Sequence, residues 1–434
     1  MVSLDSNYLD LPPVDNNRQV FHGFFRFPGS FHPPLIQYLI QKNENRDNIG
    51  DPMCGSGAVA LESVATGKNV TSMDIDPLSC LITKIKSKPV ETDIISNIIN
   101  DWLSLIGDAP QPQNSSQKEA LEYKLSLENN TKYRFPKNVF HWFDPYVIID
   151  ISKSLLSIRD MKLENVFFTE ILEAIVASII RRVSRADPQP VSGLEVTKIM
   201  RARLKNGLVF DVKKEINKRC KILLDGYEHL NCIDNIGESI VYNGDILKDW
   251  TNLCQKYDKK FDLIITSPPY CNAIEYWRRH RLEYFWLGMM DNDEILSKSR
   301  QFIGTTTSFL SDLREMDALY DVNSKLAKNT ILKIKSKGKI KKSLIIKRYF
   351  IFAEKWIEEI MKTLGENGVC YLIVGPSTSY GVHIKTPDII SEISNAFGYK
   401  NEISMNYNIK NQRMQYTTKN NIRIKTESVI KITK

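Results

Sequence analysis

The sequence lacks the patterns that mark a zinc protein, a disulfide-bonded secreted protein or a membrane protein. Its seven cysteines include no Cys-x-x-Cys pair, and an odd number without ligand spacing argues against a zinc site and a disulfide framework. No apolar run is long enough to span a bilayer, and the first residues have neither the basic nor the apolar part of a signal peptide. These absences predict a cytoplasmic protein with no bound metal and no membrane contact.

A strong charge imbalance is also missing. The net charge is +8, and 42% hydrophobic with 25% charged residues is ordinary for a soluble globular protein. A modest positive charge is compatible with a polyanionic partner but does not identify one. The length of 434 residues exceeds one ordinary hydrophobic core and predicts two or three structural units.

The most informative stretch is Phe261–Tyr270, with the sequence FDLIITSPPY. Leu263, Ile264 and Ile265 form a short apolar run, which is typical of a buried central strand in a parallel sheet. Two successive prolines cannot donate hydrogen bonds to a sheet, so the strand should end near Ser267. The residues that follow would then lie at the carboxyl end of the strand, where ligands bind in open α/β sheets.

The Ser-Pro-Pro-Tyr corner suits the binding of a planar amine. The Ser267 hydroxyl and the Pro268 carbonyl can accept the two hydrogens of an exocyclic amino group, and the Tyr270 ring offers a flat face. Because the motif contains neither an acid nor a thiol, its target would be a nucleophile that needs only orientation and a strong electrophile. A proline-capped strand end without chemistry is the alternative interpretation of so short a motif.

A glycine-rich loop near the N-terminus forms a second candidate site. The chain predicts a strand at Asn48–Gly50, a loop at Asp51–Gly57 (DPMCGSG) and a helix that continues through Ala65. Glycines let the backbone approach a ligand closely, and the helix N-terminus favours a carboxylate or phosphate. A second predicted strand ends at Asp74, at the spacing where an acid binds ribose hydroxyls in nucleotide-binding folds.

The two motifs together resemble those of amino-methylating DNA methyltransferases. Thr266–Tyr270 (TSPPY) is similar to their catalytic motif in the spelling of the cytosine-N4 branch, whereas the adenine-N6 branch more often begins with Asp or Asn. The loop DPMCGSG followed by MDIDP resembles the S-adenosylmethionine site of class I methyltransferases. The resemblance implies an α/β fold of the class I methyltransferase (Rossmann-like) type, a doubly wound mixed sheet with a mostly helical inserted subdomain. It also implies S-adenosylmethionine as cofactor and double-stranded DNA as partner.

The resemblance further implies roles for single residues. The catalytic residues would be Ser267, Pro268, Pro269 and Tyr270. The cofactor-binding residues would be Ser30, Phe31, Asp51, Cys54, Gly55, Gly57, Asp74, Asp245 and Thr266. Within this set, Asp74 would accept from the ribose and Asp245 from the adenine amino group. A nicotinamide-dependent oxidoreductase is the competing class, because the loop also fits a relaxed dinucleotide pattern, although Ser-Pro-Pro-Tyr has no role in hydride transfer.

Residues 88–238 interrupt the sheet pattern and are mostly helical by periodicity. We expect helices at Asp144–Arg159, Asn165–Arg182 and Val212–His229. Between the last two lies the run Arg181–Gly193 (RRVSRADPQPVSG), which combines arginines suited to phosphates and guanine with an amide that can pair with adenine. A helix C-terminus with dipole-compensating cations is the alternative. The predicted DNA contacts of this run are Arg181, Arg182, Arg185 and Gln189.

The segment Cys271–Trp286 is predicted to be a helix on which Tyr276, His280 and Tyr284 align at four-residue spacing. Such a helix could hold a flipped nucleotide and its phosphates, and its aromatic residues could equally belong to the core. The Cys271 thiol is expected to be a bystander, and His280 is expected to be structural or to face a phosphate. The predicted DNA contacts of this segment are Arg278, Arg279 and Arg281.

Val322–Ala353 contains a basic block without a single acid. Alternation of isoleucine and lysine at 332–335 predicts an exposed strand or a loop, and such a block is often only a solvated surface. Its place after the substrate end of the sheet favours contact with the DNA backbone by Lys335 and Lys339, which would make affinity fall steeply with salt.

The predicted organisation has five parts. They are a first catalytic part with the cofactor loop at 1–87, a helical insert for DNA recognition at 88–238, a second catalytic part with TSPPY at 239–300, a basic loop region at 301–345 and a closing catalytic part at 346–434. The predicted activity is site-specific methylation of cytosine N4 in duplex DNA, in a restriction-modification or orphan modification system, with a cognate endonuclease as a candidate partner. Adenine-N6 methylation, methylation of an RNA base amine or a protein amide, and a non-enzymatic DNA-binding module are the open alternatives.

Overall fold

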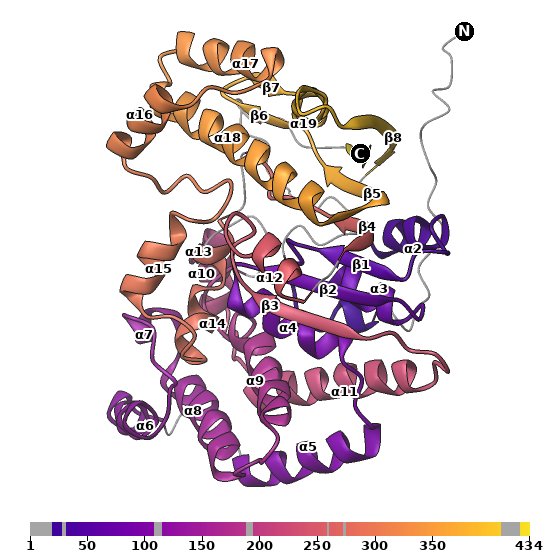
Figure 1. Cartoon of the computed structure of the whole chain (residues 1–434). Coiled ribbons are helices and arrows are strands. Elements are labelled where there is room, and N and C mark those ends of the chain that lie inside the picture. Colours follow the sequence, from indigo (N-terminus) through magenta and orange to yellow (C-terminus); the bar gives the residue numbers. More distant parts are fainter. Residues whose placement is uncertain are drawn as a thin grey trace, which may run out of the picture.

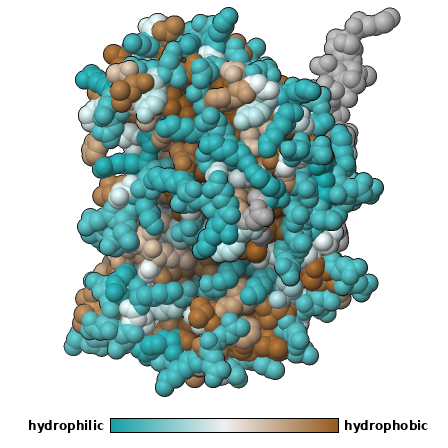
Figure 2. All heavy atoms as spheres, in the orientation of Figure 1, coloured by the Kyte–Doolittle hydropathy of each residue, from teal (hydrophilic) through white to brown (hydrophobic). Residues whose placement is uncertain are grey.

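The computed structural model describes residues 20–27, 32–107, 115–187, 194–257, 260–271, 275–408 and 426–434. Within these residues, no helix is both long and apolar enough to cross a membrane. Figure 2 shows one face of the molecule, on which hydrophilic side chains predominate and hydrophobic ones form scattered groups.

A seven-stranded mixed sheet forms the centre of the molecule, as Figure 1 shows. In spatial order its strands are β3 (Ser239–Asn243), β2 (Asn69–Asp74), β1 (Asn48–Asp51), β4 (Phe261–Thr266), β5 (Leu364–Val374), β9 (Thr426–Thr433) and β8 (Lys400–Asn408). The first five strands pair in parallel, and β9 pairs antiparallel with both β5 and β8. This order, with an antiparallel pair closing a parallel sheet, is that of a class I methyltransferase.

The order of the strands also determines where a ligand can bind. From β1 the chain proceeds outward through β2 and β3 on one side, and through β4 and β5 on the other. The two directions diverge between β1 and β4, which pair through Ile49 with Leu263 and Gly50 with Ile264. In open α/β sheets, ligands bind beyond the carboxyl ends of the strands at such a switch point.

Helices cover both faces of this sheet and bury its apolar strands. One face packs against α2 (Pro33–Gln41) and α3 (Ala58–Val64). The other face packs against α12 (Trp250–Lys256), α18 (Ile340–Thr363) and α19 (Thr386–Ala396). Leu263 and Ile265 of β4 point into the first core and Ile264 into the second, so the central strand is buried on both sides as its sequence predicts.

The insert between β2 and β3 is helical, as predicted. Its helices are α5 (Thr92–Ile106), α6 (Gln117–Asn130), α7 (Val139–Trp142), α8 (Pro145–Asp160), α9 (Val166–Ile180), α10 (Lys198–Lys205) and α11 (Val212–Asn231). They share one large core with α4 (Pro77–Ser87) and α14 (Arg281–Trp286), and they form the lower part of Figure 1. The catalytic half therefore contacts the insert through the helices that follow β2 and the Ser-Pro-Pro-Tyr corner.

The prediction of a loop or exposed strand in the basic block was wrong. Region 301–345 contains α16 (Leu310–Leu319), α17 (Lys325–Ser336) and the start of α18, while α15 (Asn292–Ser299) precedes it. The alternation of isoleucine and lysine is a short part of a longer helical pattern, in which Ala327, Thr330 and Ile334 are buried on one side of α17. A small hairpin, β6 (Ser377–Ser379) and β7 (Val382–Ile384), lies outside the main sheet.

The predicted continuous helix at 271–286 is also interrupted. Helix α13 (Tyr276–Arg279) ends at His280, and α14 begins at the next residue. The three aromatic rings still follow one another, because ring centroids lie 6.5 Å apart for Tyr276 and His280 and 6.2 Å for His280 and Tyr284. His280 and Tyr284 are fully buried, so they are unable to stack on a flipped base.

Candidate active site

The carboxyl ends of β1, β2, β3 and β4 open into one cavity of about 840 Å³. The glycine loop contributes Pro52–Ser56 to its wall, the turn after β2 contributes Asp74–Asp76, and β3 is followed by Asp245 and Ile246. The opposite wall is the corner Ser267–Tyr270. The structure therefore brings the two sequence motifs together, although more than 200 residues separate them in the sequence. The cavity is completed by Phe27, Ser79, Tyr276, Gln301, Phe302 and Ile303.

The glycine loop is shaped by two residues with positive φ. Gly55 has φ 47° and Gly57 has φ 71°, a region that L side chains rarely adopt. A Cβ on Gly57 would lie 2.8 Å from the backbone Cα of Thr83 in α4, so the position also requires the absence of a side chain. Gly57 packs against α4 instead of lining the cavity, whereas Cys54 and Gly55 line it. The predicted cofactor contact of Gly57 stays a prediction, and the structure shows this residue shaping the loop.

Asp74 connects the end of β2 to the glycine loop. Its carboxylate accepts hydrogen bonds from the Gly55 amide at 2.8 Å and the Asp76 amide at 2.9 Å. Burial, followed by the neighbouring charge of Asp76, raises the pKa of Asp74 to about 7, and the two amide hydrogen bonds offset only part of this effect. Asp74 therefore lines the cavity, and its carboxylate is a hydrogen-bond acceptor at the position that the sequence predicts for ribose binding.

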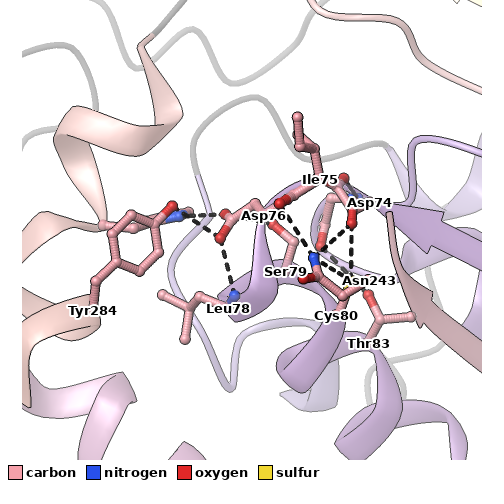
Figure 3. A network of polar contacts seen from close by, with 11 residues as sticks. Asp74, Ile75, Asp76, Leu78, Ser79, Cys80, Thr83, Asn243 and Tyr284 are labelled. Carbon is pink, nitrogen blue, oxygen red and sulfur yellow. Dashed lines mark hydrogen bonds and ion pairs between the residues drawn. The ribbon is translucent and has the colours of Figure 1, made fainter. Parts of the chain in front are cut away.

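Asp76 is the centre of a buried polar network that the sequence analysis did not identify, drawn in Figure 3. Its carboxylate caps α4 by accepting from the Leu78 amide at 2.9 Å and also accepts from the Ser79 hydroxyl at 2.8 Å. The Tyr284 hydroxyl donates to it at 2.9 Å, and Nδ1 of His280 lies 2.7 Å away. Burial opposes ionisation, but His280 and the hydroxyl donors outweigh it and hold the pKa of Asp76 below its usual value.

The Ser-Pro-Pro-Tyr corner is fixed by three hydrogen bonds. The Ser267 hydroxyl donates to the Ile373 carbonyl of β5 at 3.1 Å, so that its oxygen can act toward a ligand only as an acceptor. The Tyr349 hydroxyl donates to the Pro269 carbonyl at 2.8 Å. The Tyr270 hydroxyl donates to the Glu427 carboxylate of β9, which the sequence analysis also missed.

Three further cofactor predictions have different outcomes. Asp245 lines the cavity, accepts from the Leu247 amide at 3.0 Å, and has a pKa raised mainly by burial. Asp51 is fully buried beneath the loop and does not line the cavity, because its carboxylate faces inward and accepts from the Met53 amide at 3.4 Å. Burial raises the pKa of Asp51 to about 7, and the adjacent Thr266 hydroxyl, itself fully buried, offsets part of this rise. Asp51 and Thr266 therefore lie beneath the loop and do not line the cavity, and their contact with the cofactor stays a prediction.

Several predicted residues lie elsewhere. Ser30, Phe31 and Gln189 are outside the described residues. Cys271 is fully buried, and burial raises the pKa of its thiol to about 12, which is consistent with a bystander. In the part of the chain that the structure describes, no group of three or more His, Cys, Asp and Glu side chains is arranged to hold a metal ion.

Three of the predicted DNA-contacting arginines, Arg181, Arg182 and Arg279, line a second cavity. His280, which bonds to Asp76, also lines this cavity. Arg185 instead contacts the Asp144 carboxylate and the Phe140 carbonyl, so its guanidinium is committed to the insert.

The remaining predicted contacts lie at other surfaces. The Arg278 side chain is 52% exposed and lies 3.9 Å from Glu275, and Arg281 donates to Asn292. Lys335 and Lys339 are exposed, and the Lys339 ammonium lies 4.9 Å from the centre of the Tyr380 ring.

No protein-family model matches this chain. The type II methyltransferase M.MvaI of Kocuria varians is 23% identical over 410 residues, covering 92% of this chain and 86% of the relative. M.AvaI of Nostoc sp. is 23% identical, covering 89% of this chain and 80% of the relative, and M.BsoBI of Geobacillus stearothermophilus is 25% identical, covering 70% and 60%.

Two solved structures of the rRNA methyltransferase aviRa from Streptomyces viridochromogenes overlap with this chain, with TM-scores of 0.32 and 0.28. Both are 10% identical, and the first overlap covers 85% of each chain. The fold assignment therefore depends on the strand order and not on these overlaps.

Proposed function

We propose that this chain is a site-specific DNA methyltransferase that methylates the exocyclic N4 amino group of cytosine in duplex DNA. The observation that carries the proposal is the shared cavity, into which the corner Ser267–Tyr270, the glycine loop and Asp74 all open. Relatives that bear the name type II methyltransferase over most of this chain support it. Such enzymes belong to restriction-modification systems, so a cognate endonuclease is a natural partner.

The methyl donor is S-adenosylmethionine, which supplies an electrophilic methyl group on a sulfonium when it is bound. The cavity suits this cation, because the side chains of three acidic residues line it: Asp74, Asp76 and Asp245. In this proposal Asp74 accepts from the ribose hydroxyls and Asp245 from the adenine amino group. Ile246 and Phe302 provide apolar surface for the adenine ring.

The corner would orient the nucleophile. An extruded cytosine costs a few kcal/mol to unstack, and the face of Tyr270 would replace part of the lost stacking. The Ser267 oxygen and the Pro268 carbonyl would accept the two amino hydrogens, which directs the nitrogen lone pair toward the methyl group. Since Ser267 donates its own hydrogen to Ile373, it is already oriented to accept. Orientation of this kind can contribute roughly 7–11 kcal/mol to the rate.

Single substitutions in the corner test this assignment. Ser267→Ala and Tyr270→Ala should lose methyl transfer to duplex DNA but retain S-adenosylmethionine binding by calorimetry. Cys271→Ala is the matched control, because it changes the next residue without touching the proposed chemistry, and it should retain transfer. Full transfer by Ser267→Ala, or loss of activity in Cys271→Ala without unfolding, would contradict the assignment.

Adenine N6 is the second candidate target, because a hydroxyl and a carbonyl acceptor suit either base amine. Mass analysis of nucleosides from methylated DNA separates the two products. Parallel assays on duplex DNA and structured RNA test the RNA alternative. The helical insert at 88–238 is proposed as the DNA-recognition part, and its exchange with that of a relative should change the sequence methylated.

A further inference from the structure

A second cavity, of about 420 Å³, lies where α9, the α13–α14 junction and the N-terminal aromatic segment meet. Its charged lining consists of Arg26, Arg181, Arg182, Arg279, His280 and Glu283. None of these residues lines the first cavity. The two cavities are nevertheless adjacent, because the His280 imidazole that lines the second bonds to Asp76, which lines the first.

Three buried side chains in this cavity, Arg279, His280 and Glu283, have polar atoms without a hydrogen-bond partner among the described residues. Arg279 is only 4% exposed, yet its Nε and Nη1 donate to no described residue. His280 is 3% exposed, and while Nδ1 contacts Asp76, Nε2 has no partner. Native proteins rarely leave buried guanidinium nitrogens unsatisfied, since each costs about 1–3 kcal/mol, so these donors are available to a ligand that enters the cavity.

The charge balance indicates the sign of that ligand. Four guanidinium groups and one carboxyl group line the cavity, although Arg182 also lies 4.0 Å from the Glu215 carboxylate and Arg181 donates to the Asp187 carbonyl. Burial together with repulsion by Arg181 lowers the pKa of Arg279 to about 9. Burial raises the pKa of Glu283, so this group can be protonated and donate a hydrogen bond. The lining of the cavity therefore carries more positive than negative groups, and the buried Arg279 offers it unused donors.

We propose that this cavity binds a phosphate group of the DNA backbone beside the target nucleotide. The inference rests on the proposed function for the source of the phosphate, but the anion site itself follows from Arg279 and His280. A guanidinium fork is suited to phosphate oxygens, and Arg181 and Arg182 lie next to it just beyond the end of α9. A phosphate held at His280 would be two side chains away from the cofactor cavity, which places the backbone of the substrate close to the reacting centre.

The cofactor carboxylate is the competing anion, and the experiment separates the two. Arg279→Gln removes the charge while keeping amide donors, and Arg159→Gln on α8, an exposed residue paired with Asp160, removes the same charge away from the cavity. DNA affinity would be measured for each across a salt series, and S-adenosylmethionine affinity by calorimetry. Arg279→Gln should weaken DNA binding at least about tenfold and reduce the salt slope by about one, with cofactor affinity unchanged and Arg159→Gln equal to wild type.

Inorganic phosphate tests the anion site independently of DNA. Phosphate should raise the melting temperature of the wild type more than an equal ionic strength of chloride does, and this difference should vanish in Arg279→Gln. If that variant does not fold, Arg182→Gln at the half-exposed edge gives the same comparison. Unchanged DNA affinity and salt slope, or loss of cofactor binding instead of DNA binding, would overturn the proposal. A wild type that responds to phosphate but never binds DNA would refute the proposed function and leave an anion site of another origin.

Discussion

The ionisation of Asp74 predicts how cofactor binding depends on pH. A carboxylate accepts hydrogen bonds from ribose hydroxyls, so the cofactor should bind preferentially to the ionised form. Because the pKa of Asp74 is raised to about 7 in the free protein, affinity should rise as the pH increases through 7 and level off above 8. From the ionised fractions at a pKa of about 7, the dissociation constant should be about tenfold larger at pH 6 than at pH 8.

Calorimetry of S-adenosylmethionine binding between pH 5.5 and 8.5 measures this dependence. The cofactor's own amino group titrates near about pH 8, so the informative quantity is the difference between the wild type and Asp74→Asn at each pH. Asp51→Asn is the matched control, because Asp51 has a pKa raised to about 7 as well but does not line the cavity. The tenfold dependence should disappear in Asp74→Asn and persist in Asp51→Asn. The opposite pattern would refute the assignment of Asp74.

Three further predictions concern the loop and the corner. Gly57→Ala should destabilise the fold by about 2 kcal/mol or more in chemical denaturation. Gly207→Ala, in the turn that ends α10 with φ 82° and open space around it, should cost only the backbone strain of about 1–2 kcal/mol, and equal losses would remove the steric argument. Asp51→Asn should increase the free energy of unfolding by up to about 4 kcal/mol at pH 8, as measured by chemical denaturation. The reason is that the pKa of the Asp51 carboxyl is 3.8 in the unfolded chain and about 7 in the folded protein, so ionisation at pH 8 favours unfolding. The gain should vanish near pH 4, where the carboxyl group is largely neutral in the folded protein. Tyr270→Phe should cost about 1–3 kcal/mol by leaving the half-buried Glu427 without its donor, and adding Glu427→Leu should recover part of the loss. A purely additive double variant would contradict the pairing.

The sheet could be predicted from the sequence because its strands are short apolar runs with clear ends. The prolines after Ser267 and the acid at Asp74 both end strands as expected. Helix α17 could not be predicted from the alternation of isoleucine and lysine at 332–335, which is typical of a strand. The helical spacing of the buried residues Ala327, Thr330 and Ile334 is visible only over a longer segment. Local alternation in a basic segment is ambiguous, and only packing against the neighbouring helix decides it.

The cavity was predicted in outline, but its supporting contacts were not. Asp76 precedes a proline at the start of α4, which is a readable capping signal. Its contact with His280 spans 204 positions, and the contact of Tyr270 with Glu427 spans 157, so neither pairing has a local sequence signal. The division between residues that line the cavity and those beneath it, such as Asp51, likewise depends on side-chain direction in the folded chain.

The most direct test of the account is nucleoside mass spectrometry of plasmid DNA from cells that express the chain. The account predicts N4-methylcytosine at one short sequence, present with the wild type and absent with Ser267→Ala. Methylated adenine in its place would reassign the target base, and DNA without any methylated base, from cells containing folded protein that binds S-adenosylmethionine, would contradict the central claim.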